Sequence, residues 1–95
     1  MNKTTHFKIS LKQLKLNKID KLFFNTEGVK NADGGRYKEA SEYFTKAIDL
    51  APEDSLSYFN RATVKMNLGD ILGARSDFAS SERCQVSSVS IINQG

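Results

Sequence analysis

The sequence predicts an all-α fold in which two antiparallel helix-turn-helix hairpins stack on each other. Three observations predict it: the chain matches itself at a shift of 34 residues, its apolar residues recur with helical spacing, and its one proline separates two helical segments. Repeats of about 20 to 50 residues are typical of stacked hairpin arrays. The 95 residues suit a single domain with a modest core.

The internal repeat brings small and aromatic residues onto equivalent positions. Within residues 20–95, five pairs are identical under the shift: Asp20 and Asp54, Leu22 and Leu56, Gly35 and Gly69, Ala40 and Ala74, Phe44 and Phe78. Helices pack closely where side chains are small, and rings fill the space that remains. We therefore expect a core made of Gly28, Ala40, Ala62 and Ala74 with Phe24, Phe44, Tyr58 and Phe78.

The lysine-rich start, residues 1–19, is expected to extend or cap the stack. It holds five lysines and no acid and so has a charge of +5. The remaining residues, 20–95, sum to −2, which gives the whole chain its net charge of +3. Its apolar residues continue with roughly helical spacing into the first repeat, at Leu11, Leu14, Ile19, Leu22 and Phe23. Ser10 and Gln13 resemble a capping box, which predicts a helix from about Ser10 that shields one face of the stack.

Three alternatives stay open for this start. Phe7, Ile9 and Leu11 alternate, which would suit a short extended piece before the helix. The lysines can also be the solvated face of a helix. A lysine-rich amphipathic segment can instead attach to an anionic membrane surface or direct transport to an organelle, although this one has no arginine.

The first hairpin is expected to turn at Gly34 and Gly35 and to end before Pro52. Glycine tolerates the conformation that a sharp turn needs. The second helix presents one face of apolar and small residues, Tyr37, Ala40, Phe44, Ala47 and Ile48. Proline forbids continuation of that helix, so the chain starts a new one, with Asp54 or Ser55 as its cap.

The second hairpin repeats this pattern and then departs from it. Gly69 marks its turn, and Ile71, Ala74 and Phe78 recur on one face. The tail, residues 85–95, mixes apolar residues with serines. We expect a truncated cap or a frayed end there, and the alternative is a surface that pairs with a second copy of the chain.

These positions resemble the pattern of the tetratricopeptide repeat family over about residues 20–84, with repeat 1 at about 21–54 and repeat 2 at about 55–84. The first unit matches at Phe24, Gly28, Gly35, Tyr37, Ala40, Phe44, Ala47 and Pro52, and the second at Tyr58, Ala62, Gly69, Ile71, Ala74 and Phe78. Ser81 and Val86 stand where the pattern has alanine and proline. The resemblance implies that the hairpins stack into a right-handed superhelix.

The resemblance also implies a non-enzymatic protein–protein interaction module. The first helix of each pair would line a concave groove that holds a peptide or helix of another protein. On this chain the groove positions are Leu22, Asn25, Val29, Ala32, Leu56, Phe59, Asn60, Thr63 and Met66. Apolar members would supply buried contact, while Asn25 and Asn60 would hydrogen-bond the partner's backbone. The alternative is a structural self-association unit, a homodimer, whose groove is filled by its own ends or by a twin.

A further alternative is recognition of a chaperone's C-terminal tail. Asn60, Arg61 and Ala62 resemble a run found in the co-chaperone subgroup of the family, where the asparagine helps clamp a terminal carboxylate. That clamp also needs a lysine and an asparagine in the first helix, where this chain has Asn25 and Val29. A carboxylate gains little from one amide without cationic partners.

No group of residues points to catalysis. His6 is the single histidine, so the chain has neither a catalytic dyad nor a histidine-based metal cluster. The segment from Asp33 to Arg36 lacks the lysine and hydroxyl residue of a phosphate loop. The lysines of residues 1–19 are not interleaved with rings that stack on bases. We therefore expect no enzymatic activity, cofactor, metal, small-molecule substrate or nucleic-acid partner.

Cysteine usage and hydropathy predict a cytoplasmic protein. The one cysteine, Cys84, cannot form an internal disulfide, which fits a reducing compartment. The longest early apolar run, Leu22 to Phe24, is far shorter than a signal-peptide core or a membrane span.

Overall fold

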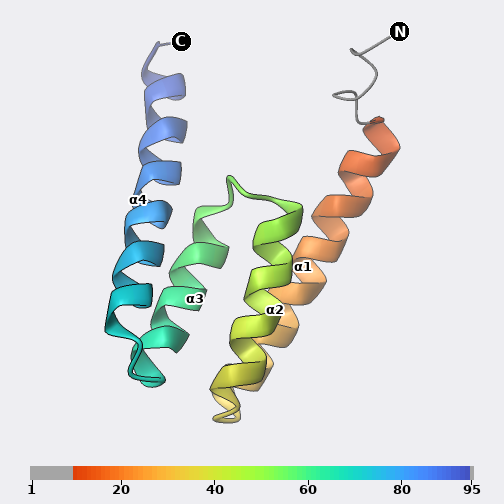
Figure 1. Ribbon diagram of the computed structural model, residues 1–95. Helices are drawn as coiled ribbons and strands as arrows, with labels where there is room; N and C mark the ends of the chain where they lie inside the picture. Colours follow the sequence, from red (N-terminus) through yellow and green to blue (C-terminus); the bar gives the residue numbers. More distant parts are fainter. Residues whose placement is uncertain (1–9, 95) are drawn as a thin grey trace, which may run out of the picture.

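Four α-helices make up the part of the chain that the computed structural model describes, which is the backbone of residues 10–94 and the side chains of residues 10–13 and 15–86. The helices are α1 (Leu11–Asp33), α2 (Tyr37–Leu50), α3 (Ser55–Asn67) and α4 (Ile71–Gln94). They lie side by side in chain order, with α2 packed on α1 and α3, and α3 packed on α4 (Figure 1). The predicted all-α fold of two stacked antiparallel hairpins is confirmed.

The first helix runs without a break across residue 20. Ser10 is its N-cap, and its hydroxyl accepts a hydrogen bond from the backbone N–H of Gln13 at 3.0 Å, as predicted. The first turns of α1 project beyond α2 (Figure 1), and Leu11 and Ile19 are exposed there. The capping role predicted for residues 1–19 stays a prediction. The extended piece considered before the helix lies outside the described residues.

Glycine makes both hairpin turns. Gly35 has φ 78° and Gly69 has φ 84°, in the left-handed region that other residues enter only at a cost. After the second turn, the side chain of Asp70 accepts a hydrogen bond from the backbone N–H of Gly73 at 3.0 Å and caps α4. The turns predicted at these glycines are confirmed.

Pro52 lies in the connection between the hairpins, where α2 stops before it and α3 begins after it. Asp54 occupies the N-cap position of α3, but its side chain makes no bond to the backbone there. Its carboxylate accepts instead from the Ser57 hydroxyl at 2.5 Å and lies 3.8 Å from Lys21 Nζ. The predicted backbone capping by Asp54 is therefore wrong, because other side chains occupy its carboxylate.

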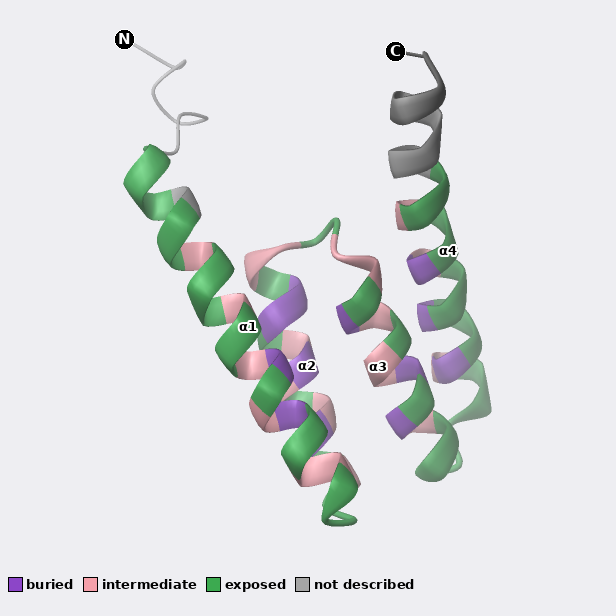
Figure 2. Ribbon diagram, turned by 180° about the vertical axis from the view of Figure 1, so that it is seen from behind, coloured by how far each residue is buried: buried purple, intermediate pink, exposed green. Residues whose placement is uncertain are grey.

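The core lies where the hairpins meet, and small residues make it close-packed (Figure 2). Phe44 is 1% exposed, and a Cβ added at Gly28 would overlap its ring. The alanines Ala40, Ala62 and Ala74 are fully buried, as predicted. Burying a ring of this kind stabilises the fold by roughly 1.5 to 3 kcal/mol.

Phe78, the equivalent of Phe44, departs from the prediction. It is 36% exposed and packs edge-on against Phe59, with ring centroids 5.5 Å apart. The reason is architectural, since no helix in the described part of the chain covers the outer side of α4. The two other rings predicted for the core, Phe24 and Tyr58, are half-buried.

The last helix continues through the tail as far as Gln94. The predicted truncated cap or frayed end is thus, over residues 85–94, a continuation of α4. Cys84 is half-buried, with its Sγ 3.9 Å from the carbonyl oxygen of Pro52. Of the described helices, none combines the length and the apolar character needed to cross a bilayer.

Candidate functional site

The first helices of the two hairpins, α1 and α3, border a shallow depression of about 310 Å³, here named the α1–α3 groove. Three exposed apolar side chains, Leu22, Val29 and Leu56, face it. Apolar side chains gathered on one surface mark interaction sites, whereas single ones are ordinary. The full lining is Leu22, Asn25, Thr26, Val29, Lys30, Leu56 and Asn60.

The groove holds part of the set that the sequence predicts. Five of the nine predicted residues line it: Leu22, Asn25, Val29, Leu56 and Asn60. Ala32 is half-buried and packs on the core. Thr63 and Met66 are exposed on α3 outside this depression, and Phe59 packs on Phe78 toward α4. The depression is thus restricted to the middle of α1 and the first turns of α3.

Asn25 forms the floor of the groove. It is 8% exposed, and its amide nitrogen donates to the Ser57 hydroxyl at 2.9 Å. Ser57 is fully buried and donates in turn to the carboxylate of Asp54. This polar chain ties α1 to α3 and fixes the spacing of the groove walls. Asn25 donates one of its two amide hydrogens to Ser57 and also lines the groove, so its predicted hydrogen bond to a partner's backbone stays a prediction.

The sequence-based prediction omits Thr26 and Lys30, which also line the groove. The internal repeat could have predicted both residues. Thr26 falls on Asn60 under the 34-residue shift, and Lys30 follows it by four residues on the same helical face. Lys30 Nζ lies 3.3 Å from the carboxylate of Glu27, and its side chain is 66% exposed. One partly paired positive charge therefore stands at the rim.

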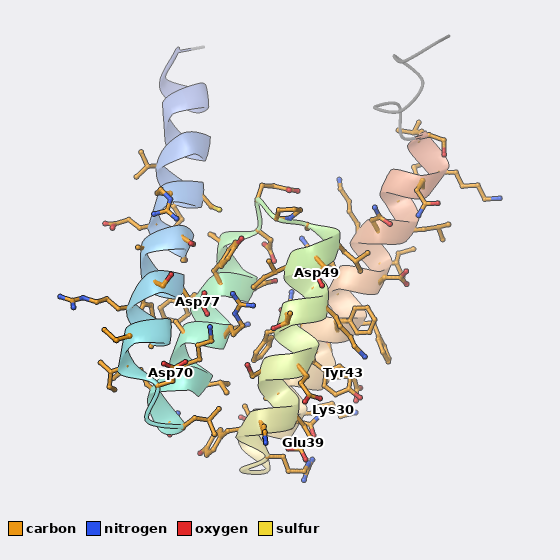
Figure 3. The ribbon with its side chains drawn as sticks, viewed as in Figure 1. Lys30, Glu39, Tyr43, Asp49, Asp70 and Asp77 are labelled. Carbon is orange, nitrogen blue, oxygen red and sulfur yellow. The ribbon has the colours of Figure 1, made fainter. Side chains whose placement is uncertain are left out.

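A second polar cluster lies away from the groove, around Asp77 on α4 (Figure 3). Arg61 donates to its carboxylate through two nitrogens at 2.7 and 2.9 Å, and Lys65 adds a contact at 3.0 Å. Arg61 also donates to Thr45 of α2 at 3.0 Å. The cluster therefore joins α2, α3 and α4.

The charges of this cluster stabilise each other. Burial alone would raise the pKa of Asp77, but hydrogen bonds from Arg61 and Lys65 outweigh it and hold that pKa below its ordinary value. The hydrogen bond to Asp77 raises the pKa of Arg61 in return. Both shifts favour the charged forms of Asp77 and Arg61, so this ion pair holds helices together and is not poised for proton transfer.

The groove chemistry suits binding. Its lining supplies aliphatic groups, two amides, a hydroxyl and an amine. Among the described side chains, no group of three or more histidine, cysteine or acidic residues could hold a metal ion. His6 lies outside the described residues.

Two antiparallel hairpins that nest through small residues, with a groove between their first helices, define a helical-hairpin repeat protein. A tetratricopeptide repeat model matches residues 32–54, which cover α2 and the connection to α3. The resemblance to the tetratricopeptide repeat family is thereby confirmed. This match supports a protein–protein interaction module in general terms, and the family is generally a non-enzymatic scaffold.

Curated relatives match about half of the chain. Tetratricopeptide repeat protein 36 of Danio rerio is 39% identical over 51 residues, which are 54% of this chain and 27% of that protein. DnaJ homolog subfamily C member 7 of Homo sapiens and of Mus musculus is 45% identical over 47 residues, 50% of this chain and 10% of each protein. The matched part of the chain therefore spans at most about a quarter of these relatives. No solved structure gives a significant match.

Proposed function

We propose that the α1–α3 groove binds a peptide or helix of another protein. The observation that carries this proposal is the convergence of Leu22 and Val29 from α1 with Leu56 from α3 over one depression. They are 65%, 43% and 56% exposed. Covering an exposed leucine fully contributes roughly 1.5 to 3 kcal/mol. A partner that presents two or three apolar side chains fits this lining.

Polar groups at the edge would orient the partner. The side-chain amide of Asn60 makes no hydrogen bond to another described residue, so it is free to pair with a partner's backbone. Thr63 and Met66 lie further along α3 and would extend the contact for a longer ligand. Asn25 would support the floor, and its second amide hydrogen would remain for the partner's backbone.

The proposal is tested with peptides selected from a random display library on the unaltered chain and titrated by fluorescence anisotropy. Leu22→Ala and Leu56→Ala should each weaken binding roughly tenfold, since truncating a central apolar contact removes on the order of 1 to 2 kcal/mol. Leu11→Ala is the matched control, an exposed leucine outside the groove. Unchanged affinity in both groove variants would remove the groove as the site.

A second candidate is recognition of a terminal carboxylate, as in the chaperone-tail hypothesis. Two of the relatives are named DnaJ homologs, and Lys30 and Asn60 both line the groove. The pairing of Lys30 with Glu27 weakens this candidate, because little cationic charge is left for a carboxylate.

The chemical group at the peptide's C-terminus distinguishes the apolar-groove proposal from terminal-carboxylate recognition. The apolar-groove proposal predicts equal affinity for one selected peptide with a free carboxylate or an amide at its C-terminus. Tail recognition predicts a preference for the free carboxylate that Lys30→Gln abolishes.

We also propose that this interaction takes place in the cytoplasm. The single, unpaired Cys84 supports a reducing compartment. Imaging of a fluorescent fusion of the natural protein in its own cells tests this, and exclusive signal from an organelle or membrane would contradict it.

A further inference from the structure

The outer side of α4 carries an uncovered surface distinct from the α1–α3 groove. It lies at the edge of the stack (Figure 1) and is largely exposed (Figure 2). A depression of about 540 Å³ opens there between α3 and α4. Its lining, here named the end face, is Phe59, Arg75, Phe78, Ala79, Ser81, Glu82 and Gln85.

The internal repeat indicates that a helix belongs on the end face. The equivalent surface of the first hairpin is covered by α3, where Phe44 packs with Val64 and is 1% exposed. Phe78 occupies the same position in the second hairpin and remains 36% exposed. A third hairpin would begin near Val89 by the same period, but α4 is still helical through Gln94. The described chain therefore does not supply the covering helix.

A single stripe on α4 carries the pattern that such a helix would meet. Ile71, Arg75, Phe78, Glu82 and Val86 follow one another at spacings of four, three, four and four residues. These spacings place them on one face of the helix. All five are exposed. The stripe is therefore an apolar surface with one positive and one negative charge.

This stripe is complementary to an antiparallel copy of itself. With a two-fold axis between Phe78 and Ala79, normal to both helices, the two Phe78 rings pack against each other beside the axis. Arg75 then faces Glu82 of the other α4, and this pair of opposite charges occurs twice. At the outer turns, Ile71 faces Val86, so apolar residues also meet. Isologous contacts require this kind of self-complementarity.

The two charges are available for contacts between copies. Arg75 and Glu82 are exposed, and neither forms an ion pair with another described residue. Charge pairs placed across an interface fix register and disfavour other arrangements more than they add affinity. We propose that two copies of this chain associate through their end faces, with the two α4 helices antiparallel and each occupying the place of a third hairpin's first helix.

A charge-swap series on the full chain tests this dimer by sedimentation equilibrium over a concentration series. The unaltered chain should dimerise. Arg75→Glu and Glu82→Arg should each weaken association roughly tenfold or more, because like charges then face each other. The double variant should restore association, which a merely unfolded chain could not do. Lys38→Glu and Glu42→Arg on α2 are the matched controls and should leave association unchanged.

Cross-linking gives a second readout that tests the register. In a Cys84→Ser background, Ala79→Cys places a thiol beside the two-fold axis and should give a disulfide-linked dimer under mild oxidation. Ser80→Cys, about 100° further round the same helix and away from the stripe, should not. A chain that stays monomeric throughout, a double variant without restored association, or equal cross-linking at both positions would overturn the proposal.

Discussion

The two hairpins follow one sequence pattern but hold together in different ways. In the first, Phe44 is 1% exposed, with Gly28 making room for its ring. In the second, the equivalent ring of Phe78 is 36% exposed and Ala62 stands where the glycine would be. The same residue is thus buried in one hairpin and open in the other, because within the described residues a following hairpin packs against the first one only.

Polar interactions mark the second hairpin. Asp77 takes the position that Tyr43 holds in the first hairpin, and it binds Arg61 and Lys65. Tyr43 instead packs on Phe24, with ring centroids 6.3 Å apart. Repeat position therefore decides which residues are neighbours, while the chemistry between them differs from one hairpin to the next.

The largest expected effect is the difference in stability lost when each of the two equivalent rings, Phe44 and Phe78, is removed. Phe44→Ala should lower the free energy of unfolding by about 3 to 5 kcal/mol, since it empties a close-packed site. Phe78→Ala should cost about 1 kcal/mol, because water already covers part of its ring. Urea unfolding followed by far-ultraviolet circular dichroism measures both. Equal losses would contradict the difference in burial.

The second largest expected effect is the stability lost when the ion cluster around Asp77 is broken. Asp77→Asn should lower the free energy of unfolding by roughly 2 to 3 kcal/mol at neutral pH, because Arg61 and Lys65 lose a buried, hydrogen-bonded counter-charge. The matched exposed change, Asp20→Asn, should have little effect. Comparable losses in the two variants would show that the cluster adds nothing specific.

Lowering the pH should remove the stabilisation that the charged Asp77 contributes. The pKa of Asp77 is lower in the folded chain than in the unfolded one, so its stabilisation is present above the unfolded value and is lost as pH falls through the folded value. The stability gap between the unaltered chain and Asp77→Asn should therefore narrow below about pH 4. Urea titrations at a series of pH values measure this gap, and one that widens in acid would contradict the lowered pKa.

Exchanging glycine and alanine at the equivalent positions 28 and 62 should have an intermediate effect on the free energy of unfolding. Gly28→Ala should destabilise by about 1 to 2 kcal/mol, because displacing the Phe44 ring outweighs the roughly 1 kcal/mol gained in helix propensity. Ala62→Gly should also destabilise, by about 1 kcal/mol, through lost helix propensity. Thermal unfolding compares the two, and a stabilising Gly28→Ala would show that the ring yields without cost.

The smallest expected effect concerns the link between the hairpins. Lys21 lies 3.8 Å from Asp54, and both side chains are partly exposed. Lys21→Ala should therefore change the free energy of unfolding by less than about 1 kcal/mol, and the change should shrink with added salt. A larger, salt-independent loss would mean that the contact belongs to the core.

Sequence periodicity was sufficient for the helices, their turns and the small-residue core, because these depend on local spacing and on equivalent positions. It was insufficient for predicting which polar side chains bind each other. Asn25 was predicted to bind a partner's backbone, and the sequence did not show that it also binds Ser57. Asp77 was not predicted to matter, because its two cationic partners lie on another helix. The exposure of Phe78 depends on the absence of a covering helix in the described chain, which residue types alone do not encode.

Binding in the α1–α3 groove is tested most directly by amide chemical-shift mapping of the labelled chain during titration with a selected peptide. The largest shifts should fall on Leu22, Val29, Leu56 and Asn60, with little change on the outer side of α4. Shifts concentrated on α2 or on the end face, with the groove amides unmoved, would contradict the proposed binding site.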